Sequence, residues 1–386
     1  MFPPIPTLPA PLFLHLTGHL AIMLLFFQFT VVILTSTYLN CFWRCIVTSS
    51  TLLTSIPSLD HFIGGGLPIG SILLIEEDTY STYSKVMYKY FIAEGIVNNH
   101  LVFVATQETL PSEIVSELPA VEEESHTLKE SSIKDEEMKI AWRYQNMKIF
   151  DSGPKDSSVF GHYYDLTKRM SEDTLNKANV ELWDGENVQC QHSIFENTGY
   201  MDLLLSIEKA ITSGQFLVSQ TPEKRNILRI AIQSLGSRLW LSDSEDQTQK
   251  DLLKFLYMLR ALLRESFTVA MITVPTLNFD EMSDVVQRVE HLSDIVVGLE
   301  SFAGSSKEAN PIFKDYHGLL HVKKLPAFNT LIHQDVLYSD LAFKLRRKKF
   351  LIEVLHLPPE FGDSAQREQD EQVVCSSGSS KHKLDF

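Results

Sequence analysis

The chain has 386 residues, enough for one large or two ordinary domains, and 44% of them are hydrophobic, enough for a sizeable core. Its formal net charge of −15 argues against a protein that wraps nucleic acid by bulk electrostatics, because such domains are usually basic. The four cysteines are scattered and have no second pair or histidine at zinc spacing, so the sequence predicts no metal site, no disulfide framework and a reducing compartment: Cys41, Cys45, Cys190 and Cys375.

The first 43 residues contain no Asp, Glu, Lys or Arg. Taken at face value, residues 12–39 could span a bilayer, and Arg44 just after them would leave the body of the protein on the cytoplasmic side. A secretory signal fits poorly because there is no positive charge ahead of the apolar run. Residues 1–50 are therefore set apart as an atypical hydrophobic segment, and a membrane-anchored scaffold is one alternative function.

Residues 54–78 combine a short helix, a glycine turn and a buried strand. Pro57 suits a helix start, and Leu59, Phe62 and Ile63 follow at helical spacing. Gly64–Gly66 allow positive φ angles, and the apolar run from Ser71 to Ile75 predicts a buried strand. This order of elements is typical of the core of RecA-like ATPases, in which the strand leads into a phosphate-binding P-loop.

A P-loop is missing after this strand. A phosphate cradle requires glycines whose N–H groups converge on the ligand, whereas this chain continues with Glu76, Glu77 and Asp78 and has no glycine before Lys85. Three carboxylates at a phosphate site repel the ligand. Lys85 is either a relic of the P-loop lysine or an exposed lysine on a helix from Ser84 to Gly95, and the second interpretation is favoured.

The body alternates strands and helices, which predicts an α/β fold with a mainly parallel sheet flanked by helices. We assign residues 51–357 to one RecA-like domain, interrupted by an acidic insertion at about residues 121–137 that is expected to be disordered. The polar residues 358–386 are expected to form a disordered tail.

Aromatic and basic residues alternate between residues 138 and 170, for example Trp142, Arg143, Tyr163 and Tyr164. Such a pattern can stack on RNA bases, but it is also common at protein interfaces, and the interface interpretation is favoured. His162 and Asp165 lack a visible third partner for acid–base chemistry, so structural roles are expected for them.

The strand Ile227–Ile232 ends in Gln233. In RecA-like ATPases the corresponding strand ends in an acid that holds magnesium, and an amide cannot supply that charge. Both the phosphate-binding and the metal-binding parts of the ATPase are therefore predicted to be lost, with no catalytic residue, cofactor or metal in this chain.

Residues 344–349 form the densest basic cluster, in which Lys344, Arg346 and Arg347 are candidate contacts to an RNA backbone. The alternative, a solvated edge strand that charge protects from aggregation, is favoured.

Several motifs resemble the Elongator complex protein 4 family. They include Ile56–Asp60, Leu73–Asp78, Tyr88–Gly95, Lys139–Tyr144, Phe160–Asp165, Asn226–Ile230, Asp315–Leu319 and Lys383–Phe386. The resemblance covers residues 54–386 and not residues 1–50. That family has no membrane anchor, so an incorrect translation start or an untypical exon is expected for the first 50 residues.

The resemblance implies a function as well as a fold. In that family the protein joins Elongator complex proteins 5 and 6 in a heterohexameric ring, which docks on the catalytic Elongator subcomplex. The complex modifies the wobble uridine of transfer RNAs (tRNAs), and its expected locations are the cytoplasm and the nucleus. On this interpretation the chain is a non-catalytic structural and RNA-binding subunit.

By fold analogy, residues 233–247 and 275–286 should lie near the RNA, with Arg238 as the best phosphate contact. Arg143, Arg229 and Arg260 are candidate contacts to neighbouring subunits. The competing function is an ATPase with an untypical pocket between subunits, in which Arg143, Arg225 or Arg264 would act on a neighbour's nucleotide.

Overall fold

The computed structural model describes residues 51–122, 161–186, 194–279, 284–308, 310, 313–327 and 340–355. Residues 1–50, almost all of the acidic insertion, Trp142, Arg143 and the tail from residue 358 lie outside the described part. Among the described helices, none is both long enough and apolar enough to cross a bilayer.

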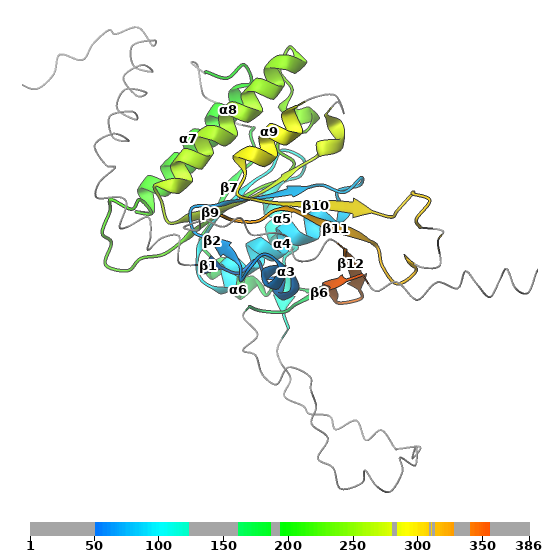
Figure 1. Cartoon of the computed structure of the whole chain (residues 1–386). Coiled ribbons are helices and arrows are strands. Elements are labelled where there is room, and N and C mark those ends of the chain that lie inside the picture. The colour runs from blue at the N-terminus through cyan, green and yellow to red at the C-terminus, as the bar shows by residue number, and fades with distance from the viewer. Residues whose placement is uncertain are drawn as a thin grey trace, which may run out of the picture.

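A nine-stranded sheet forms the centre of the molecule, in the order β13-β12-β11-β10-β3-β9-β8-β4-β7 (Figure 1). Its parallel part comprises β10 (Ile295–Ser301), β3 (Ile72–Glu76), β9 (Thr268–Val274), β8 (Leu228–Ile232), β4 (Leu101–Ala105) and β7 (Val180–Trp183). Three antiparallel strands extend it beyond β10: β11 (Gly318–Lys324), β12 (Leu341–Arg346) and β13 (Lys349–Val354). The predicted fold class, α/β with a mainly parallel sheet between helices, is confirmed.

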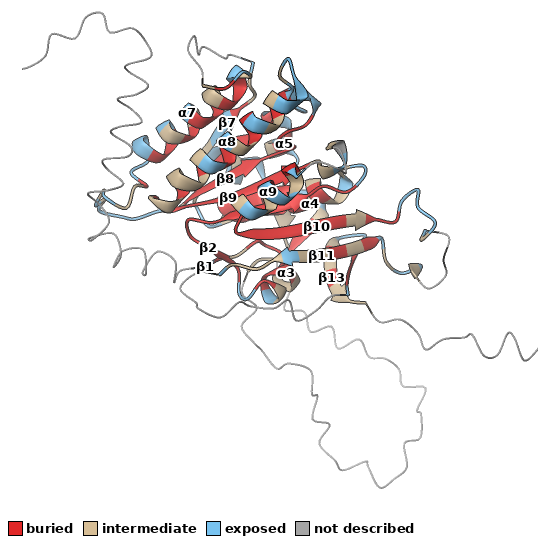
Figure 2. Ribbon diagram, turned by 45° about the horizontal axis from the view of Figure 1, so that its top comes forward, coloured by how far each residue is buried: buried red, intermediate tan, exposed pale blue. Residues whose placement is uncertain are grey.

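Helices cover both faces of the sheet. One face carries α7 (Thr198–Ser213), α8 (Glu245–Arg264) and α9 (Val285–Leu292). The other carries α3 (Pro57–Phe62), α4 (Thr82–Val97) and α5 (Pro111–Ser116). Because helices cover both faces, the strands β3, β4, β8 and β9 are buried along their whole length, while the outer faces of α7 and α8 stay exposed (Figure 2).

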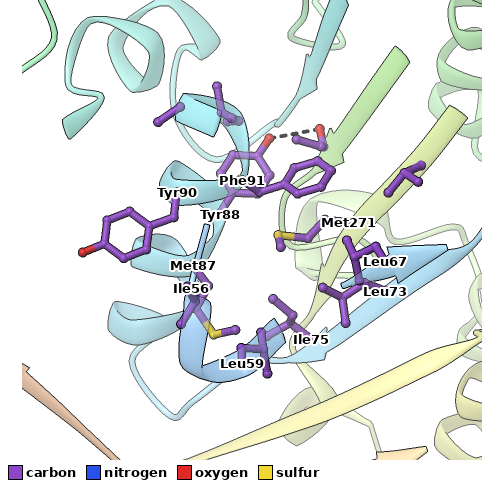
Figure 3. Packing of buried hydrophobic residues seen from close by; sticks show 14 of the residues in the cluster. Ile56, Leu59, Leu67, Leu73, Ile75, Met87, Tyr88, Tyr90, Phe91 and Met271 are labelled. Carbon is purple, nitrogen blue, oxygen red and sulfur yellow. Dashed lines mark hydrogen bonds between the residues drawn. The ribbon is translucent and has the colours of Figure 1, made fainter. Parts of the chain in front are cut away.

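The apolar core beneath α4 is built from strands that lie far apart in the sequence. Leu73 and Ile75 of β3 and Met271 of β9 pack toward Met87 and Phe91 of α4 (Figure 3). All five side chains have no exposed surface. This packing holds α4 across β4, β8 and β9, so the loop that connects β3 to α4 is held at the end of the sheet.

The glycine turn before β3 requires its glycines. Gly64, Gly65 and Gly66 all have φ between 92° and 112°, in the region that residues with a Cβ rarely adopt. A Cβ on Gly66 would lie 2.5 Å from the carbonyl oxygen of Leu52, because β1 (Thr51–Leu52) pairs with β2 (Leu67–Pro68) at this point. The prediction of positive φ angles here is confirmed.

The last strands differ from the prediction. β11 lies inside the sheet between β10 and β12, and β13 forms the edge. Residues 344–349 were expected to form a solvated edge strand, but β12 lies between β11 and β13 and its first four residues are buried. Side chains of α4 and α3 cover the outer edge of β13, so charge is not needed to protect it from pairing with another strand. Phe350 N–H donates to the Tyr90 hydroxyl at 3.3 Å, and Ile352 N–H donates to Ser58 Oγ at 3.4 Å.

Five smaller elements complete the described structure. β5 (Pro119–Val121) pairs with β6 (Tyr164–Arg169) on either side of the insertion, and α6 (Glu172–Lys177) leads from β6 to β7. Two short 3₁₀ helices, η2 (Arg238–Trp240) and η3 (Thr276–Asn278), follow β8 and β9.

Candidate functional site

The loops after β3, β4, β8 and β9 meet at one edge of the sheet, here called the carboxyl edge. These four strands are parallel and adjacent, so their carboxyl ends point the same way. Ligands of open α/β sheets bind at this edge. The sequence-predicted residues Glu76, Glu77, Asp78 and Gln233 all lie here.

Asp78 occupies the position at which a helix N-terminus would hold a phosphate. Its Oδ2 accepts the N–H of Thr82 at 3.0 Å, and its Oδ1 accepts the N–H groups of Tyr83 at 3.0 Å and Ser84 at 3.1 Å. Unpaired N–H groups and the helix dipole make this position an anion site. The carboxylate is 3% exposed, so the chain's own side chain fills the anion site of α4.

Glu77 is buried among hydroxyl groups from three separate segments. Its Oε1 accepts the hydroxyl of Thr273 on β9 at 2.6 Å and that of Ser234 after β8 at 2.8 Å. Its Oε2 accepts Ser81 Oγ at 2.7 Å, and Ser81 itself has a left-handed backbone with φ of 52°. Both carboxylate oxygens are therefore satisfied within the protein, and Glu77 ties three loops of the carboxyl edge together.

Glu76 ends β3 and points toward the antiparallel strands. It accepts a hydrogen bond from Lys323 Nζ of β11 at 2.8 Å, and the same ammonium lies 2.7 Å from Glu290 Oε1 of α9. Burial raises the pKa of the Glu76 carboxyl, and the Lys323 ammonium opposes this shift. Glu76 is thus a structural ion-pair partner rather than a free acid.

Lys85 and Gln233 converge on Glu108, which follows β4. Lys85 Nζ lies 3.6 Å from Glu108 Oε2, and Gln233 Nε2 donates to the same oxygen at 3.3 Å. Lys85 is on the second turn of α4 with 44% of its side chain exposed, which fits the interpretation of an exposed helix lysine. Sequence reasoning missed Glu108, although its place directly after a buried parallel strand was a usable signal.

The rim of the carboxyl edge carries exposed apolar side chains beside Arg238. Arg238 is exposed on η2, as is its neighbour Leu239. Four loops of this edge present large hydrophobic side chains with at least half of their surface exposed: Tyr80, Leu110, Leu239, Leu241 and Leu277. Exposed apolar groups gathered in one region are typical of contacts with other proteins.

The structure corrects the expectation that Arg229 faces a neighbouring subunit. Arg229 lies on β8, and its guanidinium is fully buried under α4. It donates to Leu53 O at 3.0 Å, Phe91 O at 3.4 Å and His100 Nδ1 at 3.2 Å. Burial lowers its pKa to about 10, and the buried carboxylates of Glu94 and Asp60 oppose the shift. Arg229 therefore belongs to an internal ion cluster.

Arg260 and Arg264 lie at the opposite, amino-terminal edge of the parallel strands. Both contact Oδ1 of Asp294, at 3.4 and 2.5 Å, and Oδ2 of Asp294 accepts the N–H of Ile72 at the start of β3. Arg264 also donates to Gly70 O at 2.7 Å. Arg225 packs against the ring of Phe267, 4.2 Å from its centroid.

The basic cluster separates into one buried and several exposed side chains. Lys344 is 8% exposed, forms an ion pair with Glu353 and lies 5.7 Å from the ring centroid of Tyr316. The expectation that it contacts RNA is therefore corrected, because its ammonium is occupied within the fold. Arg346 and Arg347 are exposed. Within the described ranges, no group of three or more His, Cys, Asp or Glu side chains is arranged to hold a metal ion.

Comparison with known proteins identifies a matching family and several relatives of this chain. The sequence pattern of the PAXNEB protein family matches residues 43–386. Over 338 residues the chain is 45% identical to Elongator complex protein 4 of Homo sapiens, which covers 81% of this chain and 78% of the human protein. It is 44% identical over 344 residues to Elongator complex protein 4 of Mus musculus, covering 84% and 81%. The protein of that name from Saccharomyces cerevisiae is 22% identical over 370 residues, covering 86% and 79%.

Proposed function

The chain belongs to the PAXNEB family of Elongator complex protein 4, and from this membership we propose that it is a non-catalytic structural and RNA-binding subunit of the Elongator complex. In this proposal it builds a heterohexameric ring with Elongator complex proteins 5 and 6. The ring docks on the catalytic subcomplex and positions tRNA for modification of the wobble uridine, in the cytoplasm and the nucleus. The chemistry itself belongs to another subunit.

The observation that carries the non-catalytic assignment is the filling of the carboxyl edge by the chain's own carboxylates. Asp78 takes the N–H groups of α4 that would otherwise hold a phosphate, and Glu77 takes the hydroxyls beside it. A nucleotide would have to displace both buried carboxylates and would meet their charge. This arrangement supports a domain that has kept the ATPase scaffold without its reaction.

A RecA-like origin of the fold is supported by the place of β3. The strand that would precede a P-loop is the middle strand of the nine-stranded sheet, with β10 on one side and β9 on the other, and α4 follows it directly along the chain. Gln233 directly follows β8, two strands away from β3, at the position where an acid would hold magnesium. An inter-subunit ATPase role receives no support from Arg264, which is held by Asp294 and Gly70 at the other edge.

The rim of the carboxyl edge supports the partner assignment. Apolar side chains from four loops are exposed there, and a ring neighbour would remove them from water. Arg238 stands among them as an exposed cation that has room to reach a phosphate. In the ring, this rim would lie where neighbouring subunits and RNA meet.

Replacing Arg238 by glutamate should weaken tRNA binding by the assembled complex about tenfold and lower the salt dependence of the affinity by about one counterion, because a phosphate contact is lost. The measurement is a titration of tRNA at several salt concentrations, using the full chain co-expressed with its two ring partners. Native mass determination of the same sample should give an unchanged hexamer.

Arg288→Glu is the matched control, since Arg288 is an exposed arginine on α9 with only a 3.8 Å contact to Asp284. It should leave tRNA affinity unchanged. Equal affinities for the Arg238 and Arg288 variants would remove Arg238 from the RNA path. A chain that stays monomeric beside both partners would overturn the ring assignment.

A further inference from the structure

The hairpin between β12 and β13 carries four consecutive cationic residues, Arg346 to Lys349, with Arg347 and Lys348 at its turn. β12 is antiparallel to β11, which is antiparallel to β10, so β12 runs in the direction of the parallel strands. Phe343 is level with Gly318, which is level with Ser301 at the end of β10. The turn therefore lies beyond the residues that pair with β11, and β13 next to it packs on α4 and α3 through Tyr90 and Ser58.

A second segment, distant in sequence, adds to this surface. β6 lies beside the hairpin, because Leu166 N–H donates to Lys348 O at 2.9 Å (Figure 1). It brings two further exposed cations, Lys168 and Arg169. Six basic residues from β6 and the hairpin thus share one surface, here called the basic hairpin surface: Lys168, Arg169, Arg346, Arg347, Lys348 and Lys349.

Only half of these charges are neutralised by acids. Lys348 lies 3.6 Å from Asp165, Lys349 pairs with Glu122, and Arg169 lies 3.9 Å from Glu117. Within the described ranges, Arg346 and Arg347 have no ion-pair partner, and the charge of Lys168 only contributes, after larger causes led by the Thr167 hydrogen bonds, to the lowered pKa of Asp165. On a chain with a net charge of −15, an uncompensated basic patch produces a local positive potential that attracts an anionic ligand.

Tyr163 gives the surface a flat aromatic side chain. Lys349 Nζ lies 4.6 Å from the Tyr163 ring centroid. The ring lines a small hollow together with Pro57, Tyr90 and Leu351, and Lys349 and Leu351 also line the neighbouring hollow that contains Arg346 and Arg347. Cations that bind phosphates next to a ring that can stack on a base are the two parts of a single-strand RNA site.

We propose that the basic hairpin surface is a second RNA contact of this chain and holds a single-stranded segment of the bound RNA. Arg346 and Arg347 contact successive phosphates, for which the planar guanidinium is suited, and Tyr163 stacks on a base. The proposal rests on the RNA-binding function proposed above, but it uses residues outside the rim that carries Arg238. An acidic peptide is the competing ligand. It is disfavoured because its carboxylates would bind the cations but would not fill the hollow lined by Tyr163.

The test measures binding of labelled oligouridine and of tRNA to the assembled complex at several salt concentrations. The double variant Arg346→Glu/Arg347→Glu should lose at least about tenfold in affinity, and its salt dependence should fall by about two counterions. Tyr163→Leu should lose at least about fivefold with an unchanged salt dependence, and Tyr163→Phe should bind normally. These side chains lie at the surface, so native mass and circular dichroism should not change.

The outcomes separate this proposal from the preceding one. RNA binding that falls with Arg238→Glu but is indifferent to the hairpin variants would overturn the second contact alone. A complex that binds no RNA would overturn both. Unchanged RNA binding together with loss of salt-sensitive polyglutamate binding in the double variant would reassign the surface to an acidic protein. Arg288→Glu again serves as the control for a charge reversal elsewhere.

Discussion

Replacement of Asp78 by alanine is expected to lower the free energy of unfolding by about 2–4 kcal/mol, since three hydrogen bonds to a charged group are lost at a buried helix N-terminus. The N–H groups of Thr82, Tyr83 and Ser84 would lose their only acceptor among the described contacts. Water could replace the carboxylate only by entering a site that is now 3% exposed. Urea unfolding of the full chain, followed by circular dichroism, measures the loss.

The neighbouring exposed Thr79 supplies the control. Thr79→Ala alters the same loop without touching the helix N-terminus, so a change below about 0.5 kcal/mol is expected for it. The stability of Asp78→Asn should lie between those of Asp78→Ala and the native protein, because an amide oxygen still accepts hydrogen bonds but carries no charge. If Asp78→Ala were as stable as Thr79→Ala, the carboxylate would not be the acceptor that holds this loop.

Replacing Arg229 by methionine should lower the free energy of unfolding by about 3–5 kcal/mol, because removing one partner of a buried ion cluster leaves the other charges unpaired. The methionine fills much of the volume, so the loss reports charge and hydrogen bonding more than packing. The carbonyl groups of Leu53 and Phe91 would lose their donor, and Glu94 and Asp60 their nearby cation. Arg225→Met, which removes an exposed arginine from the same segment, should cost less than about 1 kcal/mol.

The loss of unfolding free energy in Arg229→Met, here called the deficit, should depend on pH. This dependence is an independent test of whether charge causes the loss. Burial raises the pKa of Asp60 to about 6, above its unfolded value of 3.8, so its contribution to stability is full below 3.8 and is lost as pH rises through 6. Loss of the guanidinium raises that pKa further. The deficit should therefore be larger at pH 7 than at pH 5. A deficit that is equal at both pH values would show that packing rather than charge sets the cost.

The strands were predictable where the sequence is continuously apolar. The strand predicted at Ser71–Ile75 is observed at Ile72–Glu76, one residue away, because a strand buried on both faces forms one uninterrupted apolar run. The burial of β12 was not predicted, because Lys344 is buried by an ion pair with Glu353 that only the hairpin creates. A buried lysine cannot be told from a solvated one until its partner strand is known.

The sequence predicts the loss of the phosphate site but not the contacts that fill it. The absence of P-loop glycines and the acids at positions 76–78 could be read from the chain, and they indicated a lost phosphate site. That Asp78 itself fills the site depends on a turn that brings its carboxylate onto α4. Arg229 was misjudged because its partners Glu94 and Asp60 lie more than a hundred residues away in sequence, and a lone arginine in an apolar strand gives no sign of them.

The most direct test of the account is an equilibrium titration of the purified full chain with magnesium ATP. Because Asp78 and Glu77 occupy the carboxyl edge, no saturable binding is predicted up to about 1 mM, which corresponds to less than about 4 kcal/mol of binding free energy. One-to-one binding at micromolar concentration would contradict the account. It would mean that the loop after β3 opens, releases its carboxylates and admits a nucleotide.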